Sequence, residues 1–337
     1  MKKQIVVISG ATATGKSDFA IQLAMRLDGE IINADIGSWY TPLNIGTAKP
    51  DWKNQTVPHH LFDILDEPKN FTIVQFREQV IRLAQEIWSR GKVPIVVGGS
   101  AFYVKALWYR QGDIPDAQDI QAQLHESPKT TLELWQELKT IDPSRAARLH
   151  EHDRYRIVRA LAIHHVTGQL PSNFEPIFDP IANMVGIVCV RDRQELYGRI
   201  DERVLMMLKN GWIEEVIELV QTPWADFLEH KKIIGYDDIL HYLKTDKSFD
   251  RYQELVSIIQ QKTRNYAKRQ NTFLTKLQKE VDRDLLRQDL LKQGLLRQDL
   301  PKADCVGFID EMNLTLCDVG LYINGLSDRF RRQDTEL

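Results

Sequence analysis

The chain has 337 residues and a formal net charge of −3, with 43% hydrophobic and 27% charged residues, which is typical of a globular protein with room for two domains. No apolar run approaches the roughly 20 residues that span a bilayer, and the three cysteines are too scattered for a disulfide framework or a zinc finger. We therefore expect a cytoplasmic protein without a membrane segment, in which any nucleic-acid contact depends on local clusters of lysine and arginine.

The first 112 residues alternate between short apolar runs and stretches with helical spacing. The runs at 5–9, 30–34 and 93–97 are short and rich in β-branched residues, which is typical of buried strands. Between them, residues 17–27 and 72–90 gather apolar side chains on one helical face. This alternation predicts an α/β fold, with a parallel sheet and helices on both of its faces.

A glycine-rich segment joins the first expected strand to the first expected helix. It fits the P-loop pattern G-x-x-x-x-G-K-[ST], in which backbone N–H groups and a helix N-terminus surround phosphate oxygens. Lys16 would reach the terminal phosphate, and the Ser17 hydroxyl would bind Mg²⁺. The fold class is therefore predicted to be P-loop NTPase-like. The predicted phosphate-binding residues are Gly10, Ala11, Thr12, Ala13, Thr14, Gly15, Lys16 and Ser17.

Residues 113–183 differ from what precedes them, because they show helical periodicity and no convincing strand. The best helices are expected at 131–140 and 154–167. A strand-like apolar run follows this block. An all-helical block between two α/β stretches predicts an insertion, residues 113–183, into a catalytic domain built from residues 1–112 and 184–280.

Long helices are expected in the second part of the catalytic domain, at 193–210, 213–221 and 249–278. The tail, residues 281–337, is different, because Leu-Leu-Arg-Gln-Asp-Leu occurs at 285–290 and again ten residues later. Two copies are too few for a solenoid, so the tail is given no role.

The P-loop alone leaves the phosphate compound open. ATP-hydrolysing P-loop proteins normally carry an acidic residue after a later apolar strand, where it holds Mg²⁺. Here the strand at 93–97 runs into Gly98, Gly99 and Ser100. Asp35 is the only acid at a nearby strand end, and small-molecule kinases can place a carboxylate at that point. A kinase that uses ATP therefore remains an alternative.

Several segments beyond the P-loop form a combination far more specific than the P-loop itself. They are Asp35 and the segments 45–50, 58–64, 97–103, 148–150, 199–203, 234–236 and 263–270. In residues and in order, over roughly residues 4–278, they resemble the tRNA dimethylallyltransferase family, also called tRNA isopentenyltransferases.

The resemblance implies an enzyme that uses dimethylallyl diphosphate and tRNA. It would transfer the dimethylallyl group to the exocyclic amine of the adenosine 3′-adjacent to the anticodon, in tRNAs reading codons that begin with U. The P-loop would then hold a diphosphate instead of ATP. Asp35 matches the general base of the family, and Lys16, Mg²⁺ on Ser17 and Arg203 would stabilise the leaving diphosphate. Ser100 stands where the family usually has threonine, and its hydroxyl would bond a diphosphate oxygen.

The segment after Asp35 departs from the family pattern Asp-Ser-x-Gln-x-Tyr. Ile36 replaces the serine and Ser38 replaces the glutamine, on either side of Gly37. In the family this segment positions the target base, so Ile36, Gly37 and Ser38 are assigned to tRNA. The two replacements keep open a non-catalytic RNA-binding paralogue. An isopentenyltransferase acting on free adenine nucleotides is a further alternative, although the insertion argues against it.

The resemblance gives the insertion the role of clamping the anticodon stem-loop. We expect the chain to act as a monomer. Arginines in the insertion suit phosphate contact, and lysines and arginines at 251–279 form a basic stripe on one expected helix. His59 and His60 are expected to be structural. The predicted tRNA contacts outside the segment 36–38 are Lys49, Arg148, Arg159, Arg264, Lys268 and Arg269.

Overall fold

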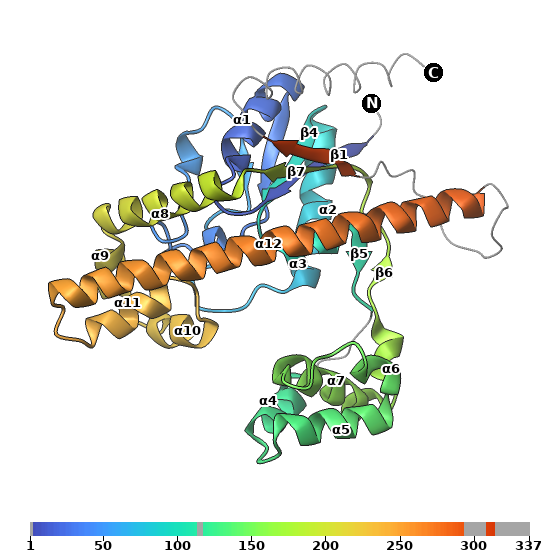
Figure 1. Ribbon diagram of the computed structural model, residues 1–337. Helices are drawn as coiled ribbons and strands as arrows, with labels where there is room; N and C mark the ends of the chain where they lie inside the picture. Colours follow the sequence, from blue (N-terminus) through green and yellow to red (C-terminus); the bar gives the residue numbers. More distant parts are fainter. Residues whose placement is uncertain (1–2, 113–116, 293–307, 314–337) are drawn as a thin grey trace. The chain divides into compact units, whose positions relative to one another are not determined.

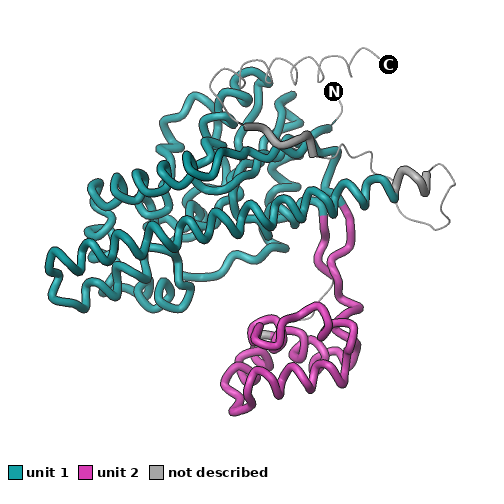
Figure 2. Tube along the Cα trace, viewed as in Figure 1, with its two compact units in different colours: residues 1–108, 180–337 teal, residues 109–179 magenta. Residues whose placement is uncertain are grey.

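A computed structural model describes residues 3–112, 117–292 and 308–313 of the chain. The chain divides into two compact units, which are coloured separately in Figure 2. The first unit contains residues 1–108 and 180–337, and the second contains residues 109–179. Both ends of the second unit lie a few residues before the boundaries predicted for the insertion. The second copy of the tail repeat lies outside the described residues.

The first unit contains a parallel sheet with the strand order β3-β2-β4-β1-β7-β8, of which β4, β1 and β7 are labelled in Figure 1. Every neighbouring pair in it is parallel. The strand β1 at its centre is buried along its whole length, as its continuous apolar run predicts. The predicted α/β class with a parallel sheet is therefore confirmed. The strands are β1 (Gln4–Gly10), β2 (Gly29–Asn33), β3 (His59–His60), β4 (Val93–Gly98), β7 (Asn183–Val190) and β8 (Phe308–Asn313).

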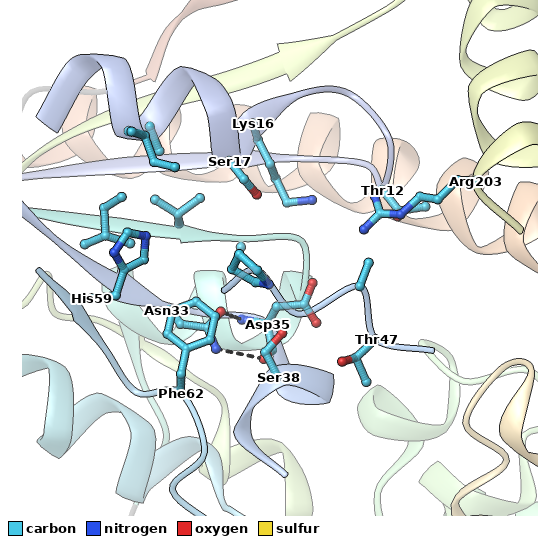
Figure 3. Close-up of a pocket in the computed structure, with 17 residues that line it drawn as sticks. Thr12, Lys16, Ser17, Asn33, Asp35, Ser38, Thr47, His59, Phe62 and Arg203 are labelled. Carbon is cyan, nitrogen blue, oxygen red and sulfur yellow. Dashed lines mark hydrogen bonds between the residues drawn. The ribbon is translucent and has the colours of Figure 1, made fainter. Parts of the chain in front are cut away.

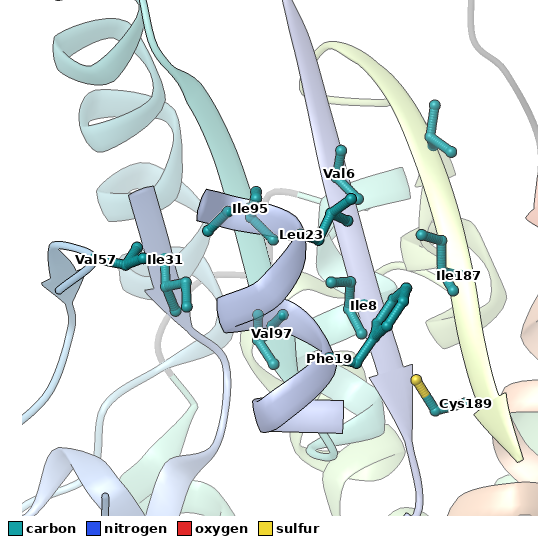
Figure 4. Packing of buried hydrophobic residues seen from close by; sticks show 13 residues of the cluster. Val6, Ile8, Phe19, Leu23, Ile31, Val57, Ile95, Val97, Ile187 and Cys189 are labelled. Atoms are coloured by element: carbon teal, nitrogen blue, oxygen red, sulfur yellow. The ribbon is translucent and has the colours of Figure 1, made fainter. Parts of the chain in front are cut away.

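The helix that follows the P-loop, α1 (Lys16–Leu27), covers one face of this sheet. Its Phe19 and Leu23 pack against Val6 and Ile8 of β1 and against Ile95 of β4 (Figure 4). All five side chains are at most 2% exposed. Burial of this apolar surface stabilises the start of α1 directly beneath the phosphate loop.

The remaining helices of the first unit include three that follow the expected positions closely and several short ones that the periodicity did not reveal. The short helices α10 and α11 each have eight residues, about two turns, which is too few for a clear apolar period. Three 3₁₀ turns also occur in the structure, at Ile36–Trp39, Trp52–Asn54 and Pro171–Phe174. The helices are α2 (Ile73–Ser89), α3 (Ala101–Trp108), α8 (Arg193–Lys209), α9 (Trp212–Leu219), α10 (Trp224–Lys231), α11 (Tyr236–Leu243) and α12 (Phe249–Lys292).

The prediction that the last long helix ends at 278 is wrong. The helix α12 continues without a break to Lys292 and contains the first copy of the tail repeat. Its apolar face continues past the predicted end, since Leu274, Leu277 and Val281 are at most 1% exposed. The sequence from 249 to 292 also contains no glycine or proline that would end the helix.

The second unit is mainly helical, and its helices at 131–141 and 154–167 match the expected ones. The expectation of no strand in residues 113–183 is wrong for one short strand, because Ile177–Phe178 (β6) lies antiparallel to Tyr109–Arg110 (β5), which precedes this range. Strands of two residues are too short to show an alternating pattern. The helices are α4 (Gln118–Glu126), α5 (Thr131–Ile141), α6 (Pro143–Ala146) and α7 (Arg154–Thr167).

Among the described residues, no helix combines the length and the apolar character that crossing a membrane requires.

Candidate active site

The P-loop lies between β1 and α1, at the carboxyl edge of the sheet where ligands bind in open α/β folds. Gly15 begins α1 with φ of 91°, a left-handed conformation that glycine adopts without strain. Two arginines beyond β7 donate to carbonyl oxygens of the loop. Arg191 Nε lies 2.8 Å from Thr14 O, and Arg199 Nε lies 2.9 Å from Ala13 O. Their guanidinium groups therefore brace the loop and add positive charge beside it.

A third brace comes from α12. The side chain of Gln270 is 3% exposed and bonds in two directions. Its Oε1 accepts the Thr12 N–H at 3.0 Å, and its Nε2 donates to Gly99 O at 2.7 Å. Gln270 thus joins the phosphate loop to the end of β4. Gln270 belongs to the family-like segment 263–270, but the sequence did not indicate this bracing role.

Asp35 lies just beyond β2 and is fixed through its backbone. Its N–H donates to Asn33 Oδ1 at 2.9 Å, and Asn33 Nδ2 donates back to Asp35 O at 3.2 Å. The next N–H, of Ile36, donates to Ser100 Oγ at 3.2 Å. Ser100 is 6% exposed, and the structure therefore gives it a role in holding the turn after Asp35.

One pocket brings part of the predicted phosphate loop together with two of the three predicted catalytic residues, whereas the third, Ser100, does not line it (Figure 3). Thr12, Lys16 and Ser17 line it from the P-loop side, and Asp35 and Arg203 line it as well. Ser38, from the turn after Asp35, also faces it. The rest of its lining is mostly apolar, and comprises Ala20, Ile21, Ile31, Asn33, Thr47, Ala48, Pro50, His59, Phe62, Val97 and Gly98.

The charged groups of this pocket influence one another. Burial lowers the pKa of Lys16; the Asp35 carboxylate opposes this shift, while the Arg203 charge adds to it. Burial also lowers the pKa of Arg203, and Asp35 opposes that shift too. A carboxylate and two cations thus share one poorly solvated space, where an anionic ligand would interact strongly with the cations.

A tyrosine that the sequence did not single out also belongs to this group. Tyr266 lies one helical turn before Gln270 on α12, and its hydroxyl is close to Ser100. Burial raises the pKa of its hydroxyl, and the nearby Asp35 carboxylate acts in the same direction. The inward face of α12 therefore reaches both the phosphate loop and the neighbourhood of Asp35.

The structure does not favour the predicted contact between Lys49 and tRNA. The Lys49 side chain is 3% exposed and forms an ion pair with Asp63. Its ammonium also donates to Tyr40 O at 2.8 Å and to Thr41 O at 3.3 Å. Because these partners occupy the group, Lys49 has a structural role here, and we withdraw it from the tRNA contacts.

The other predicted tRNA contacts fall into two groups. On α12, Lys268 and Arg269 are exposed, whereas Arg264 forms an ion pair with Asp201 of α8. In the second unit, Arg159 is exposed and Arg148 forms an ion pair with Glu175. None of these residues lines the pocket.

Comparisons with known proteins identify the family. A profile described as IPP transferase matches residues 38–277. The chain is 41% identical over 280 residues to tRNA dimethylallyltransferase 1 of Citrifermentans bemidjiense, covering 82% of this chain and 90% of that one. It is 40% identical to the tRNA dimethylallyltransferase of Geobacter sulfurreducens, with the same coverage.

Solved structures agree. The full-length tRNA isopentenylpyrophosphate transferase of Bacillus halodurans matches with a TM-score of 0.63 and 28% identity, over 99% of this chain and 98% of that one. A eukaryotic dimethylallyltransferase acting on tRNA matches with a TM-score of 0.67 and 26% identity, over 81% and 70% of the two chains. The resemblance seen in the motifs is confirmed, and the chain belongs to the IPP transferase family.

Proposed function

We propose that this chain is a tRNA dimethylallyltransferase. It would transfer the dimethylallyl group from dimethylallyl diphosphate to the exocyclic amine of the adenosine 3′-adjacent to the anticodon, in tRNAs reading codons that begin with U. The observation that carries the proposal is the single pocket lined by Lys16 and Ser17 of the P-loop, by Asp35 and Arg203, and by apolar side chains. The names of the relatives support the same activity.

The donor would bind with its diphosphate on the P-loop and its hydrocarbon chain against the apolar lining that comes from α1, β2 and β4, namely Ala20, Ile21, Ile31 and Val97. In the transfer, the bond between the allylic carbon and the diphosphate oxygen breaks, and its electron pair leaves with the diphosphate. Negative charge grows on that oxygen as the bond breaks. Lys16 and Arg203 supply positive charge within the same pocket, and both are poorly solvated, which strengthens their effect.

The new bond joins the allylic carbon to the adenine nitrogen, which must lose a proton. Asp35 is the carboxylate that lines this pocket, and it is the group assigned to accept that proton. Its backbone is held at both ends of the residue, by Asn33 and by the link from Ile36 to Ser100. A base fixed in this way can keep the amine oriented during the transfer.

Magnesium fits the same pocket as a partner of the diphosphate. Mg²⁺ prefers oxygen ligands and commonly combines one or two protein groups with substrate phosphates and water. The Ser17 hydroxyl and the Asp35 carboxylate both line the pocket, whereas no cluster of three metal-ligating side chains occurs among residues 3–112, 117–292 and 308–313. Bound there, the ion would neutralise charge on the leaving diphosphate.

The tRNA would be contacted in both units. The exposed cations Lys268 and Arg269 of α12 and Arg159 of the second unit suit phosphate contact. The turn formed by Ile36, Gly37 and Ser38 adjoins Asp35 and is assigned to the target base. The protein would act in the cytoplasm as a monomer.

A transfer assay tests the proposal and its alternatives. The protein is incubated with Mg²⁺, labelled dimethylallyl diphosphate and either an anticodon stem-loop RNA or AMP. The stem-loop carries adenosine next to the anticodon, and a matched control RNA carries guanosine there. Label is expected only in the adenosine stem-loop. Label in AMP would support a nucleotide isopentenyltransferase instead. RNA binding without any transfer would support the non-catalytic paralogue. If neither acceptor is labelled, ATP turnover in a separate incubation with candidate metabolites would support a kinase.

A further inference from the structure

A second segment, residues 44–46, presents its own row of backbone N–H groups, and a carboxylate already occupies it. Glu215 of α9 accepts hydrogen bonds from Asn44 N at 2.9 Å, Ile45 N at 2.7 Å and Gly46 N at 3.3 Å. Three successive N–H groups that point at one site form a concavity suited to an anion. Here the anion is a side chain of the protein itself.

Two further contacts hold α9, the helix that carries Glu215, in place. The Tyr236 hydroxyl of α11 donates to Glu215 Oε1 at 2.6 Å. The indole of Trp212 lies between Gly46 and Gly235, where a Cβ atom on either glycine would come within 1.9 Å of it. The motifs at 45–50 and 234–236 therefore need their glycines because both backbones press against one buried tryptophan.

The held segment continues directly into the wall of the candidate active site. Thr47, Ala48 and Pro50 line the pocket that contains Asp35. Thr47 also packs closely on the turn after Asp35, since a Cβ atom on Gly37 would lie 2.9 Å from the Thr47 methyl carbon. A shift of residues 44–46 would therefore move this wall and press on the turn that follows Asp35.

Building on the proposed function, we propose that Glu215 is a positioning residue for the acceptor side of the pocket. Its carboxylate fixes residues 44–46, and through them it sets where Thr47 stands relative to Asp35 and the target adenosine. The donor side is held separately, because the P-loop is braced by Arg191, Arg199 and Gln270. Loss of Glu215 should therefore impair use of the RNA and spare binding of diphosphate.

The test compares Glu215→Gln with Glu214→Gln, which removes the same charge from the neighbouring exposed position of α9. In Glu215→Gln the amide group meets N–H donors that need an acceptor, so at least one bond to residues 44–46 is lost. We expect kcat/KM for the anticodon stem-loop RNA to fall by about tenfold or more, the scale of one bond to a charged group. Affinity for inorganic diphosphate should stay within about twofold, because other residues hold the P-loop, and Glu214→Gln should match wild type.

Tyr236→Phe provides a graded second variant, because it removes one of the four bonds to Glu215 and leaves the three backbone bonds. Its loss should be smaller and in the same direction. A parallel fall in diphosphate affinity would reduce Glu215 to a general stabiliser of the fold, and an unchanged kcat/KM would overturn the inference outright. Transfer by the wild-type protein tests the proposed function, whereas the ratio of variant to wild type tests Glu215. The ratio of variant to wild type can also be measured for stem-loop binding, which does not depend on transfer.

Discussion

The P-loop lines the pocket and residues 44–46 lead into its wall at Thr47, and these two backbone segments are held by groups of opposite charge. The P-loop receives donors on its carbonyl oxygens, from Arg191 and Arg199. The segment 44–46 instead gives its N–H groups to the carboxylate of Glu215. The wall formed by the P-loop is braced by cations, and the wall that begins at residues 44–46 is braced by an anion.

This difference separates the two ligands that the pocket must hold. Both segments could attract a phosphate group through their N–H groups, but the Glu215 carboxylate fills one of them and would repel a diphosphate. The cations Lys16 and Arg203, by contrast, line the pocket on the phosphate side. The arrangement thus directs an anionic donor to the P-loop and leaves the Thr47 side to a neutral base.

The largest effect is expected when the walls stay intact and only the proton acceptor is removed. Asp35→Asn keeps the shape of the side chain but cannot accept the proton, so transfer to stem-loop RNA should fall by roughly 10²–10⁴-fold. Affinity for inorganic diphosphate should be unchanged or higher, because a negative charge beside Lys16 and Arg203 disappears. Single-turnover transfer and calorimetric titration measure the two effects, and near wild-type transfer would show that another group takes the proton.

Removing the positive charge of Lys16, on the P-loop side of the pocket, should weaken donor binding. Lys16→Met keeps an unbranched stem and loses the charge, so affinity for inorganic diphosphate should fall by roughly 10- to 100-fold, the range for bonds to charged groups. Stem-loop RNA binding should not change, because the opposite wall is untouched. Lys209→Met, at the exposed end of α8, is the control that changes neither. Equal losses of RNA and diphosphate binding would contradict the separation of the walls.

A milder change removes a support of the P-loop without altering the charge of the pocket. Gln270→Leu removes both the bond to Thr12 N and the bond to Gly99 O. We expect diphosphate affinity to fall by about tenfold or less, because each neutral bond contributes modestly. Gln253→Leu, at an exposed position of the same helix, serves as the control. A loss as large as that of Lys16→Met would mean that the brace decides the loop conformation and is more than a support.

The two walls also differ in how far they could be predicted from the sequence. The P-loop is a contiguous motif between a buried strand and a helix, so its residues can be predicted from the sequence, and Asp35 can be recognised as the acid at a nearby strand end. Arg203 was implied by resemblance, and it shares the pocket. The contacts of Glu215 and Gln270 join residues about 170 to 260 positions apart, and no local pattern encodes such distances.

Lys49 illustrates the same limit for a residue that was predicted to bind RNA. A lysine near a glycine and a proline is consistent with an exposed loop contact, and no local pattern indicates its partner. The structure buries it against Asp63, fourteen positions later. Charge in a sequence indicates which residues can bind phosphate, whereas the fold decides which of them already have a partner.

The smallest effect should come from a cation that belongs to neither wall. Lys268 is exposed on α12 and is assigned to the RNA backbone. Lys268→Ala should weaken stem-loop binding only a few-fold and reduce the slope of log affinity against log salt by roughly 0.7–0.9, the value for one lost phosphate contact. Lys247→Ala removes an equally exposed lysine outside the basic stripe and should leave the slope unchanged. Diphosphate affinity should match wild type in both variants. An unchanged slope for Lys268→Ala would remove this residue from the RNA contacts while leaving the comparison of the two walls intact, because neither wall depends on it.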